Sequence, residues 1–128
     1  MTTGCTNRAT GSVSPSTNLS ALKTMYVKKI PADNREVNVL ITEKLRSKGI
    51  AVTTGVEAAP GNIDAVVTYV DKWMWDITMY MLELTIEIRD PKTDAQLATG
   101  NSLHTSLTRK SSKEMVDEVV ENIYKGKK

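Results

Sequence analysis

The stretch MYMLELTIEIR, residues 79–89, decides the fold of this chain, because large apolar side chains alternate in it with others that are mostly polar. Alternation with a period of two is typical of a β-strand that has one buried face and one partly solvated face. The pattern predicts that one set of side chains points into the core: Tyr80, Leu82, Leu84, Ile86 and Ile88. The intervening side chains, which include Met79 and Met81, are then expected on the outer face.

The apolar sequence around this stretch is too long for one strand. Residues 63–89 contain neither glycine nor proline, and they predict two antiparallel strands joined by a tight turn at or near Trp75 and Asp76. Pairing the two apolar faces requires that the numbers of opposed residues sum to an odd value. The proline and aspartates of residues 90–94 predict a turn, so residues 95–107 are expected to return as a further antiparallel strand.

Two segments combine helical spacing of apolar side chains with helix-capping signals. The first helix is predicted over residues 34–48, behind a capping box formed by Asp33 and Glu36. The second begins at a capping box formed by Ser111 and Glu114. Because each helix has only one apolar face, each must pack against another layer.

Strands are also predicted over residues 24–30 and 50–56, which are rich in β-forming residues or alternate in polarity. Since the first helix joins them through short connections, they form a parallel pair. The element order is β-α-β-β-β-β-α. These features predict an α+β fold, a two-layer sandwich in which a mixed sheet carries both helices on one face.

A length of 128 residues predicts one domain. Residues 1–20 are rich in serine and threonine and poor in large apolar side chains, so we expect a flexible tether there. The single α+β domain is then expected over residues 21–128.

Composition argues against several kinds of partner and site. Seventeen basic and fifteen acidic residues are spread along the chain, so no strong field favours nucleic acid. With Cys5 as the only cysteine and His104 as the only histidine, an intrachain disulfide and a His/Cys zinc site are excluded. The glycines are too scattered for a phosphate-binding loop, and no cofactor or metal is predicted.

The pair Gly4-Cys5 resembles the mature start of a bacterial lipoprotein, in which the signal peptide has been removed and the cysteine carries lipid. A lipid on Cys5 would anchor the domain to a membrane, since each buried methylene contributes about 0.8 kcal/mol.

Later segments resemble the core of small bacterial envelope lipoproteins of unknown function, whose fold is similar to the amino-terminal domain of the Tol translocation protein. The segments that carry this resemblance are DAVVTY at 64–69, DKWMWD at 71–76, DPKT at 90–93 and Gly100. The resemblance implies a lipid-anchored protein on the periplasmic face of the envelope, favouring the outer membrane, with an envelope protein as partner. It implies no catalytic residue.

Four side chains around the predicted hairpin are candidates for partner binding. Trp73 and Trp75 either cap the end of the core under a helix or form an aromatic anchor for a partner. Met79 and Met81 are expected on the open sheet face as part of an apolar stripe.

Three functions follow from these features. The first is a non-enzymatic, protein-binding envelope lipoprotein. The second is a small hydrolase or transferase that uses His104 with Asp71 or Asp76. The third is a self-associating structural module, such as a homodimer in which Met79 and Met81 face their symmetry mates.

Overall fold

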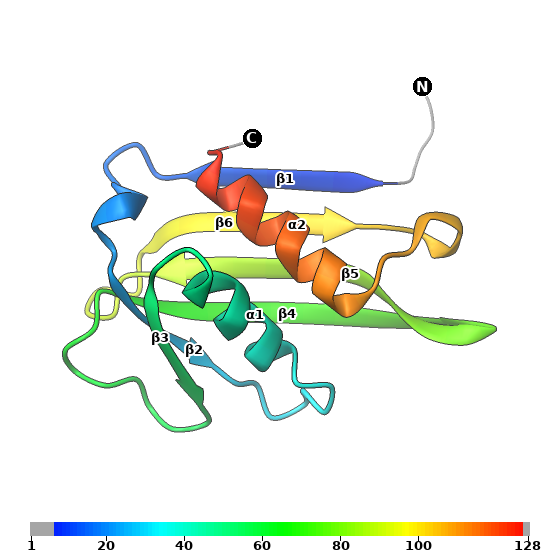
Figure 1. Ribbon diagram of the computed structural model, residues 1–128, viewed down its shortest axis with the longest axis horizontal. Coiled ribbons are helices and arrows are strands. Elements are labelled where there is room, and N and C mark those ends of the chain that lie inside the picture. The colour runs from blue at the N-terminus through cyan, green and yellow to red at the C-terminus, as the bar shows by residue number, and fades with distance from the viewer. Residues whose placement is uncertain (1–6, 127–128) are drawn as a thin grey trace.

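Six strands form one mixed sheet, and two helices cover one of its faces (Figure 1). The computed structural model describes residues 7–126. The elements are β1 (Arg8–Val13), β2 (Thr24–Lys28), α1 (Val37–Arg46), β3 (Ala51–Gly55), β4 (Ala65–Asp76), β5 (Thr78–Arg89), β6 (Gln96–Leu103) and α2 (Ser112–Tyr124). Across the sheet the strands lie in the order β1-β6-β5-β4-β2-β3. The predicted α+β fold is confirmed, including the parallel pairing of β2 with β3.

The core lies between the helices and the sheet, where apolar side chains from both layers meet. Almost fully buried there are Val27, Ile41, Val67, Leu84, Ile86, Ile88, Met115, Val119 and Ile123. Each such side chain stabilises the fold by about 1.5–3 kcal/mol relative to exposure. Within residues 7–126, no helix has the length and apolar character needed to cross a bilayer.

The two helices begin in different ways. The capping box predicted at the start of α2 is confirmed. In contrast, α1 begins at Val37 instead of residue 34, because Glu36 has a left-handed backbone with a φ of 58°. The carboxylate of Asp33 still caps α1, since it accepts the backbone N–H of Val37 at 3.3 Å.

The structure differs from the predicted tether at β1, which pairs antiparallel with β6 and places Gly11 opposite Gly100. The absence of side chains there lets α2 approach the sheet closely. A Cβ added to Gly11 would lie 2.3 Å from the backbone oxygen of Asn122, and one added to Gly100 would lie 2.7 Å from Ile123 Cγ1. The small residues that predicted disorder therefore form a docked edge strand. Residues 1–6, which include Cys5, lie outside the described residues.

The antiparallel pairing of β4 with β5 follows the predicted odd sums near the core, as in Val67 opposite Ile88. A β-bulge then shifts the register between Lys72 and Trp73, because Leu82 is an extra residue in β5. Beyond the bulge, Trp73 lies opposite Met81. The predicted outward position is therefore wrong for Met81 and also for Met79, which lies two residues before it in β5 and faces the same side.

Burial agrees with this shift. Met81 is 1% exposed and belongs to the core, whereas Leu82, which was expected inside, is only partly buried. Tyr80 is buried, but it lies outside the main core cluster that it was expected to join.

Replacing Gly11 with alanine tests whether β1 is part of the folded domain. We expect Gly11→Ala to lower the free energy of unfolding by about 1–3 kcal/mol, because the new methyl group would collide with the backbone of α2. Urea unfolding measures the change. Gly61→Ala is the matched control, since nothing lies within 4 Å of its added Cβ. Equal unfolding midpoints for the two variants would contradict the docking of β1 under α2.

Candidate functional site

The β4–β5 hairpin protrudes beyond the helices at one end of the molecule (Figure 1). Ile77 is the single residue between the two strands, and its φ of 69° is left-handed. That conformation costs a residue with a Cβ about 1–2 kcal/mol, and glycine or asparagine is the usual choice in such turns. The Ile77 side chain is also 84% exposed, so burial within the monomer does not offset the strain.

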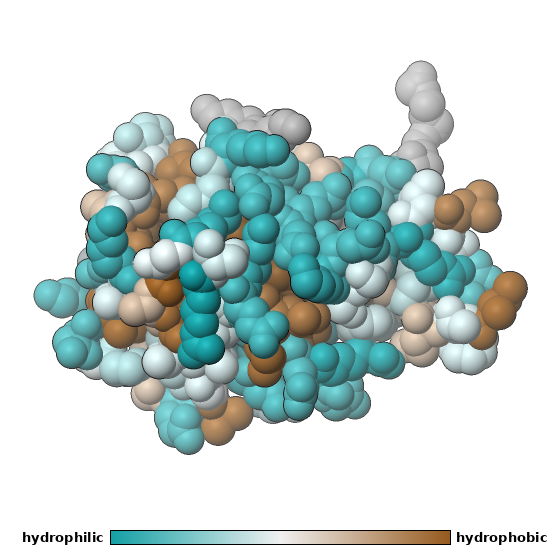
Figure 2. Space-filling view, in the orientation of Figure 1, coloured by the Kyte–Doolittle hydropathy of each residue, from teal (hydrophilic) through white to brown (hydrophobic). Residues whose placement is uncertain are grey.

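Other large apolar side chains on this hairpin are exposed as well. Met74 is 48% exposed, Trp75 69% and Met79 42%. Figure 2 shows hydrophobic surface at this end, where the hairpin tip and the loop between β6 and α2 lie. Trp75 therefore does not cap the end of the core, which was one of its two expected roles. Met79 lies opposite Trp75, on the same side of the hairpin.

Trp73 does pack against the core, on the face of the sheet that carries the helices. The guanidinium of Arg35 lies 4.2 Å from the centre of its ring, and its Nε1 donates a hydrogen bond of 2.7 Å to Asp71 Oδ2. A cation over an indole ring stabilises by about 0.5–2 kcal/mol. These contacts fix the orientation of Trp73.

A hollow of about 390 Å³ lies between the outer half of the hairpin and the start of α2. We call it the hairpin groove. Its lining includes Trp73, Met79 and Met81 from the hairpin, Arg35 from the loop before α1, and Arg109 from the loop before α2. The predicted site residues Trp73, Met79 and Met81 thus meet in one place, whereas Trp75 is not part of the lining.

The loop before α1 is held in place by Asp33, which is 4% exposed. Its Oδ2 accepts a hydrogen bond of 2.6 Å from the Tyr69 hydroxyl, and its carboxylate also accepts the backbone N–H groups of Arg35, Val37 and Asn38. Burial disfavours the charged form, but these hydrogen bonds outweigh it and lower the pKa of Asp33 below its ordinary value. The same carboxylate anchors the loop that carries Arg35.

Arg109 ties the loop before α2 to the hairpin tip. Its guanidinium lies 4.5 Å from the centre of the Tyr80 ring and donates to Thr78 Oγ1 at 2.9 Å and to the backbone oxygen of Asp76 at 3.2 Å. These contacts bring the short 3₁₀ turn that contains Leu107 beside the tip. Leu107 is 97% exposed.

His104 lies elsewhere, under α2. It is 7% exposed, and its Nε2 lies 2.7 Å from Glu118 Oε1. Among residues 7–126, no hydrogen bond or ion pair joins it to Asp71 or Asp76, which instead contact Trp73 and Arg109. The structure does not assemble the acid–base site that an enzyme using these groups would need.

The candidate metal ligands among residues 7–126 are carboxylates and a single histidine. No cluster of three or more such side chains suited to a metal ion occurs in the described part of the chain.

The sheet face opposite the helices is largely polar, in contrast to the predicted apolar stripe. Glu83 accepts hydrogen bonds from Asn101 and Arg8, and these, together with Lys72, lower the pKa of its carboxyl. Exposed apolar side chains on this face occur along β4, at Val70 and Met74.

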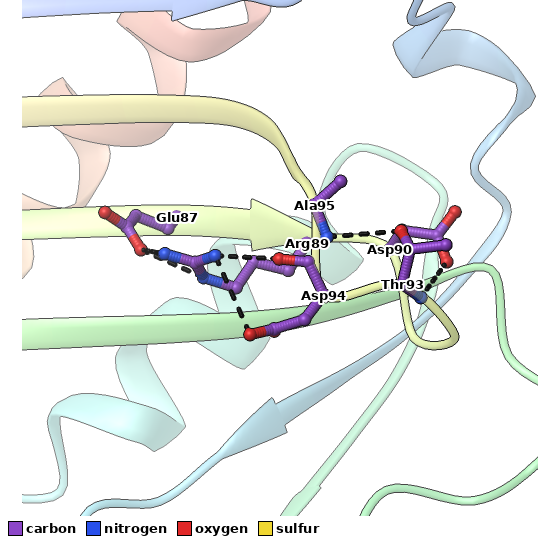
Figure 3. A network of polar contacts seen from close by, with 6 residues as sticks. All are labelled: Glu87, Arg89, Asp90, Thr93, Asp94 and Ala95. Carbon is purple, nitrogen blue, oxygen red and sulfur yellow. Dashed lines mark hydrogen bonds and ion pairs between the residues drawn. The ribbon is translucent and has the colours of Figure 1, made fainter.

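The polar face continues to the end of the sheet remote from the hairpin tip. There the Arg89 side chain lies between Glu87 and Asp94, beside the predicted turn after β5 (Figure 3). The turn itself is closed by Asp90, whose Oδ1 accepts the backbone N–H groups of Lys92 and Thr93. This end of the molecule therefore offers fixed polar groups and, among the described residues, lacks the exposed large apolar side chains of the hairpin end.

Among known proteins, similarity is found to solved structures. No protein-family model matches the chain, and no curated protein matches its sequence. PelC from Paraburkholderia phytofirmans, solved as a dodecamer, aligns with a TM-score of 0.68 and 15% identity over 91% of this chain and 97% of PelC.

Two longer proteins contain a similar domain. TolB from Acinetobacter baumannii aligns with a TM-score of 0.52 and 14% identity, over 94% of this chain and 31% of TolB. A PDZ domain protein from Parabacteroides distasonis aligns with a TM-score of 0.54 and 12% identity, over 93% of this chain and 35% of that protein. At such low identities the likeness shows a shared fold alone. The expected similarity to a domain of the Tol protein is confirmed at that level.

Replacing Asp33 with asparagine tests the anchor of the loop beside the hairpin groove. We expect Asp33→Asn to lower the free energy of unfolding at pH 7 by about 1–3 kcal/mol, because charge-assisted hydrogen bonds to four donors are weakened. Since folding lowers the pKa of Asp33, its contribution is complete above the ordinary value of 3.8 and is lost as pH falls through the lower folded-state value.

Urea unfolding at a series of pH values measures this difference. Asp117→Asn is the control, because its exposed ion pair with Lys113 on α2 contributes only about 0.3–0.5 kcal/mol. A loss in Asp33→Asn that matched the control at pH 7, or that grew as pH fell, would contradict the role of Asp33.

Proposed function

We propose that this chain is a non-catalytic accessory module of a bacterial envelope that works by binding proteins, including other copies of itself. In this proposal a lipid on Cys5 holds it at the periplasmic face of a membrane, with the outer membrane favoured. The observation that carries the proposal is the shared fold with PelC over nearly the full length of both chains, together with the dodecameric state of PelC.

The open sheet provides surfaces for self-association. A ring of identical subunits needs two different, complementary surfaces on each copy. The two edges of the sheet, β1 and β3, lie at opposite sides of the molecule, and edge strands expose unpaired backbone donors and acceptors. We assign contacts between copies to these edges, not to Met81, which is buried in the core.

The hairpin groove provides a second surface, suited to an envelope protein partner. Trp73 and Met79 line it with apolar area, and Arg35 and Arg109 add positive charge at its rim. Aromatic and arginine side chains at a concave site are typical of interface hot spots. Of the predicted contact residues, Trp73 and Met79 keep this role, and Met81 forms part of the groove floor.

The enzymatic alternative receives no support from the position of His104. Its Nε2 is occupied by Glu118, and its ring is almost fully buried. A general base must reach the proton that it removes from a substrate. The His104–Glu118 pair instead joins the end of β6 to α2, which is a structural role.

Sedimentation velocity tests self-association. We expect Cys5→Ser protein, which carries neither lipid nor an intermolecular disulfide, to form species heavier than the 14.1 kDa monomer, with a mass that rises with concentration toward a fixed multiple. The substitution removes the only cysteine, so any association must be non-covalent. A single species of monomer mass at the highest concentration reached would contradict this part of the proposal.

Intact-mass spectrometry tests the lipid anchor. We expect protein expressed with its natural upstream sequence in a Gram-negative host to be found in the membrane fraction, processed so that Cys5 is the first residue and carries acyl chains. Cys5→Ser should abolish both the added mass and the membrane fractionation. An unmodified Cys5 in the cytosolic fraction would contradict the anchor and leave the test of self-association unaffected.

A further inference from the structure

Ile77 is unfavourable for the monomer in two independent ways. It is a β-branched residue with a left-handed backbone, and its side chain is 84% exposed. Strained backbone conformations persist where the surrounding structure holds them, and they cluster at functional sites. An apolar side chain held outward at the most prominent point of a hairpin needs an apolar environment outside the molecule.

The neighbours of Ile77 extend this apolar tip. Eight large hydrophobic side chains are exposed in the described chain, and five of them lie on the hairpin's outer half or on the loop fixed against it. We call these five residues the apolar tip: Met74, Trp75, Ile77, Met79 and Leu107. The protruding end of the hairpin and the neighbouring loop carry these residues (Figure 1). Together they form a convex surface. A convex tip is poorly shaped for the roughly 800 Å² that each partner buries in a stable protein interface.

Carboxylates close to the apolar tip contact neighbouring cations or hydrogen-bond donors. Asp76 Oδ2 lies 3.7 Å from Arg109 Nη2, and Asp71 accepts the indole N–H of Trp73. Further from the tip, Glu83 contacts Arg8 at 2.7 Å and Lys72 at 3.6 Å. The charges of Asp76 and Glu83 are thus paired with cations, whereas Asp71 keeps its negative charge.

The start of the described chain lies at the same end. Thr108 Oγ1 donates a hydrogen bond of 2.7 Å to Asn7 Oδ1, and Thr108 belongs to the same 3₁₀ turn as Leu107. Two peptide links separate Cys5 from Asn7, so their Cα atoms lie within about 7.6 Å of each other. A lipid on Cys5 would therefore enter a bilayer beside the apolar tip.

We propose that the apolar tip is a membrane-docking surface, which inserts Ile77, Trp75 and Leu107 into the interfacial region of a lipid bilayer. Tryptophan is enriched at this depth of membranes, where its ring is buried and its N–H remains near polar groups. Aliphatic side chains beside it add apolar area. Trp75, for which the sequence left open a cap on the core or an anchor for a protein partner, is assigned to the bilayer. This inference goes beyond the proposed function, and it holds for unlipidated protein as well.

Vesicle binding by the Cys5→Ser protein tests the docking surface without any lipid anchor. The probe is a suspension of vesicles of phosphatidylethanolamine and phosphatidylglycerol, sedimented with the protein. We expect Ile77→Asn to lower the partition coefficient by roughly tenfold, because burial of an isoleucine side chain contributes about that factor or more. Asparagine tolerates left-handed backbone, so this variant should fold at least as stably as its parent.

Val56→Asn is the matched control, since Val56 is 60% exposed and lies outside the apolar tip. It should bind vesicles as its parent does. A second readout is the tryptophan emission of the parent protein, in which Trp75 is 69% exposed and Trp73 packs against the core. This emission should shift to shorter wavelength on addition of vesicles, and Ile77→Asn should reduce that shift.

Two results would overturn the docking surface. One is the absence of vesicle binding by the parent protein, or equal binding by Ile77→Asn and Val56→Asn. The other is a loss of self-association in Ile77→Asn with vesicle binding unchanged, which would identify the tip as a contact between copies. Because the parent lacks Cys5, failure here differs from failure of the lipid anchor, which is measured by mass on the natural protein.

Discussion

The β-bulge between Lys72 and Trp73 determines which side chains the outer half of the hairpin presents to each side. One extra residue in a strand reverses the facing of every residue beyond it. Here the reversal moves Met81 into the core and leaves Tyr80 on the side where Arg109 can cover it. The hairpin groove exists because Trp73 and Met81 then face the helices together. Both the groove and the apolar tip depend on this single irregularity.

The elements were predictable because their signals are local. Alternation over residues 79–89 and helical spacing near α2 are properties of short windows, and the strand and the helix that they predict are both confirmed. The bulge was not predictable, because Leu82 is apolar like Tyr80 and Leu84 on either side of it in the alternation. The sequence pattern therefore shows no interruption. The strand β1 was missed for another reason. Serine, threonine and glycine predict disorder in a short window. The role of Gly11, which is to leave room for α2 beside Gly100, is evident only from the three-dimensional structure.

The docking of β1 changes what an anchor at Cys5 would do. A flexible tether of about 20 residues would let the domain range roughly 25 Å from the bilayer. With β1 beginning at Arg8, only a few residues separate the cysteine from the sheet. Such an anchor would keep the domain close to the membrane, and insertion of the apolar tip would turn the hairpin end toward the bilayer. Contacts between copies through the sheet edges would be formed in the plane of the membrane, where tethered copies already share one orientation.

The strain at Ile77 can persist only because the hairpin behind it is fixed at several points. Arg35 and Asp71 hold Trp73, and Arg109 joins the tip to the loop before α2. A hairpin without these contacts would relax the left-handed turn or fold its apolar side chain back toward the groove. Stabilising contacts at the base thus maintain an unfavourable residue at the tip. A rigid base that holds a strained apolar residue outward is expected of a site that docks onto a bilayer. The bilayer supplies the apolar surroundings that Ile77 does not have within its own chain.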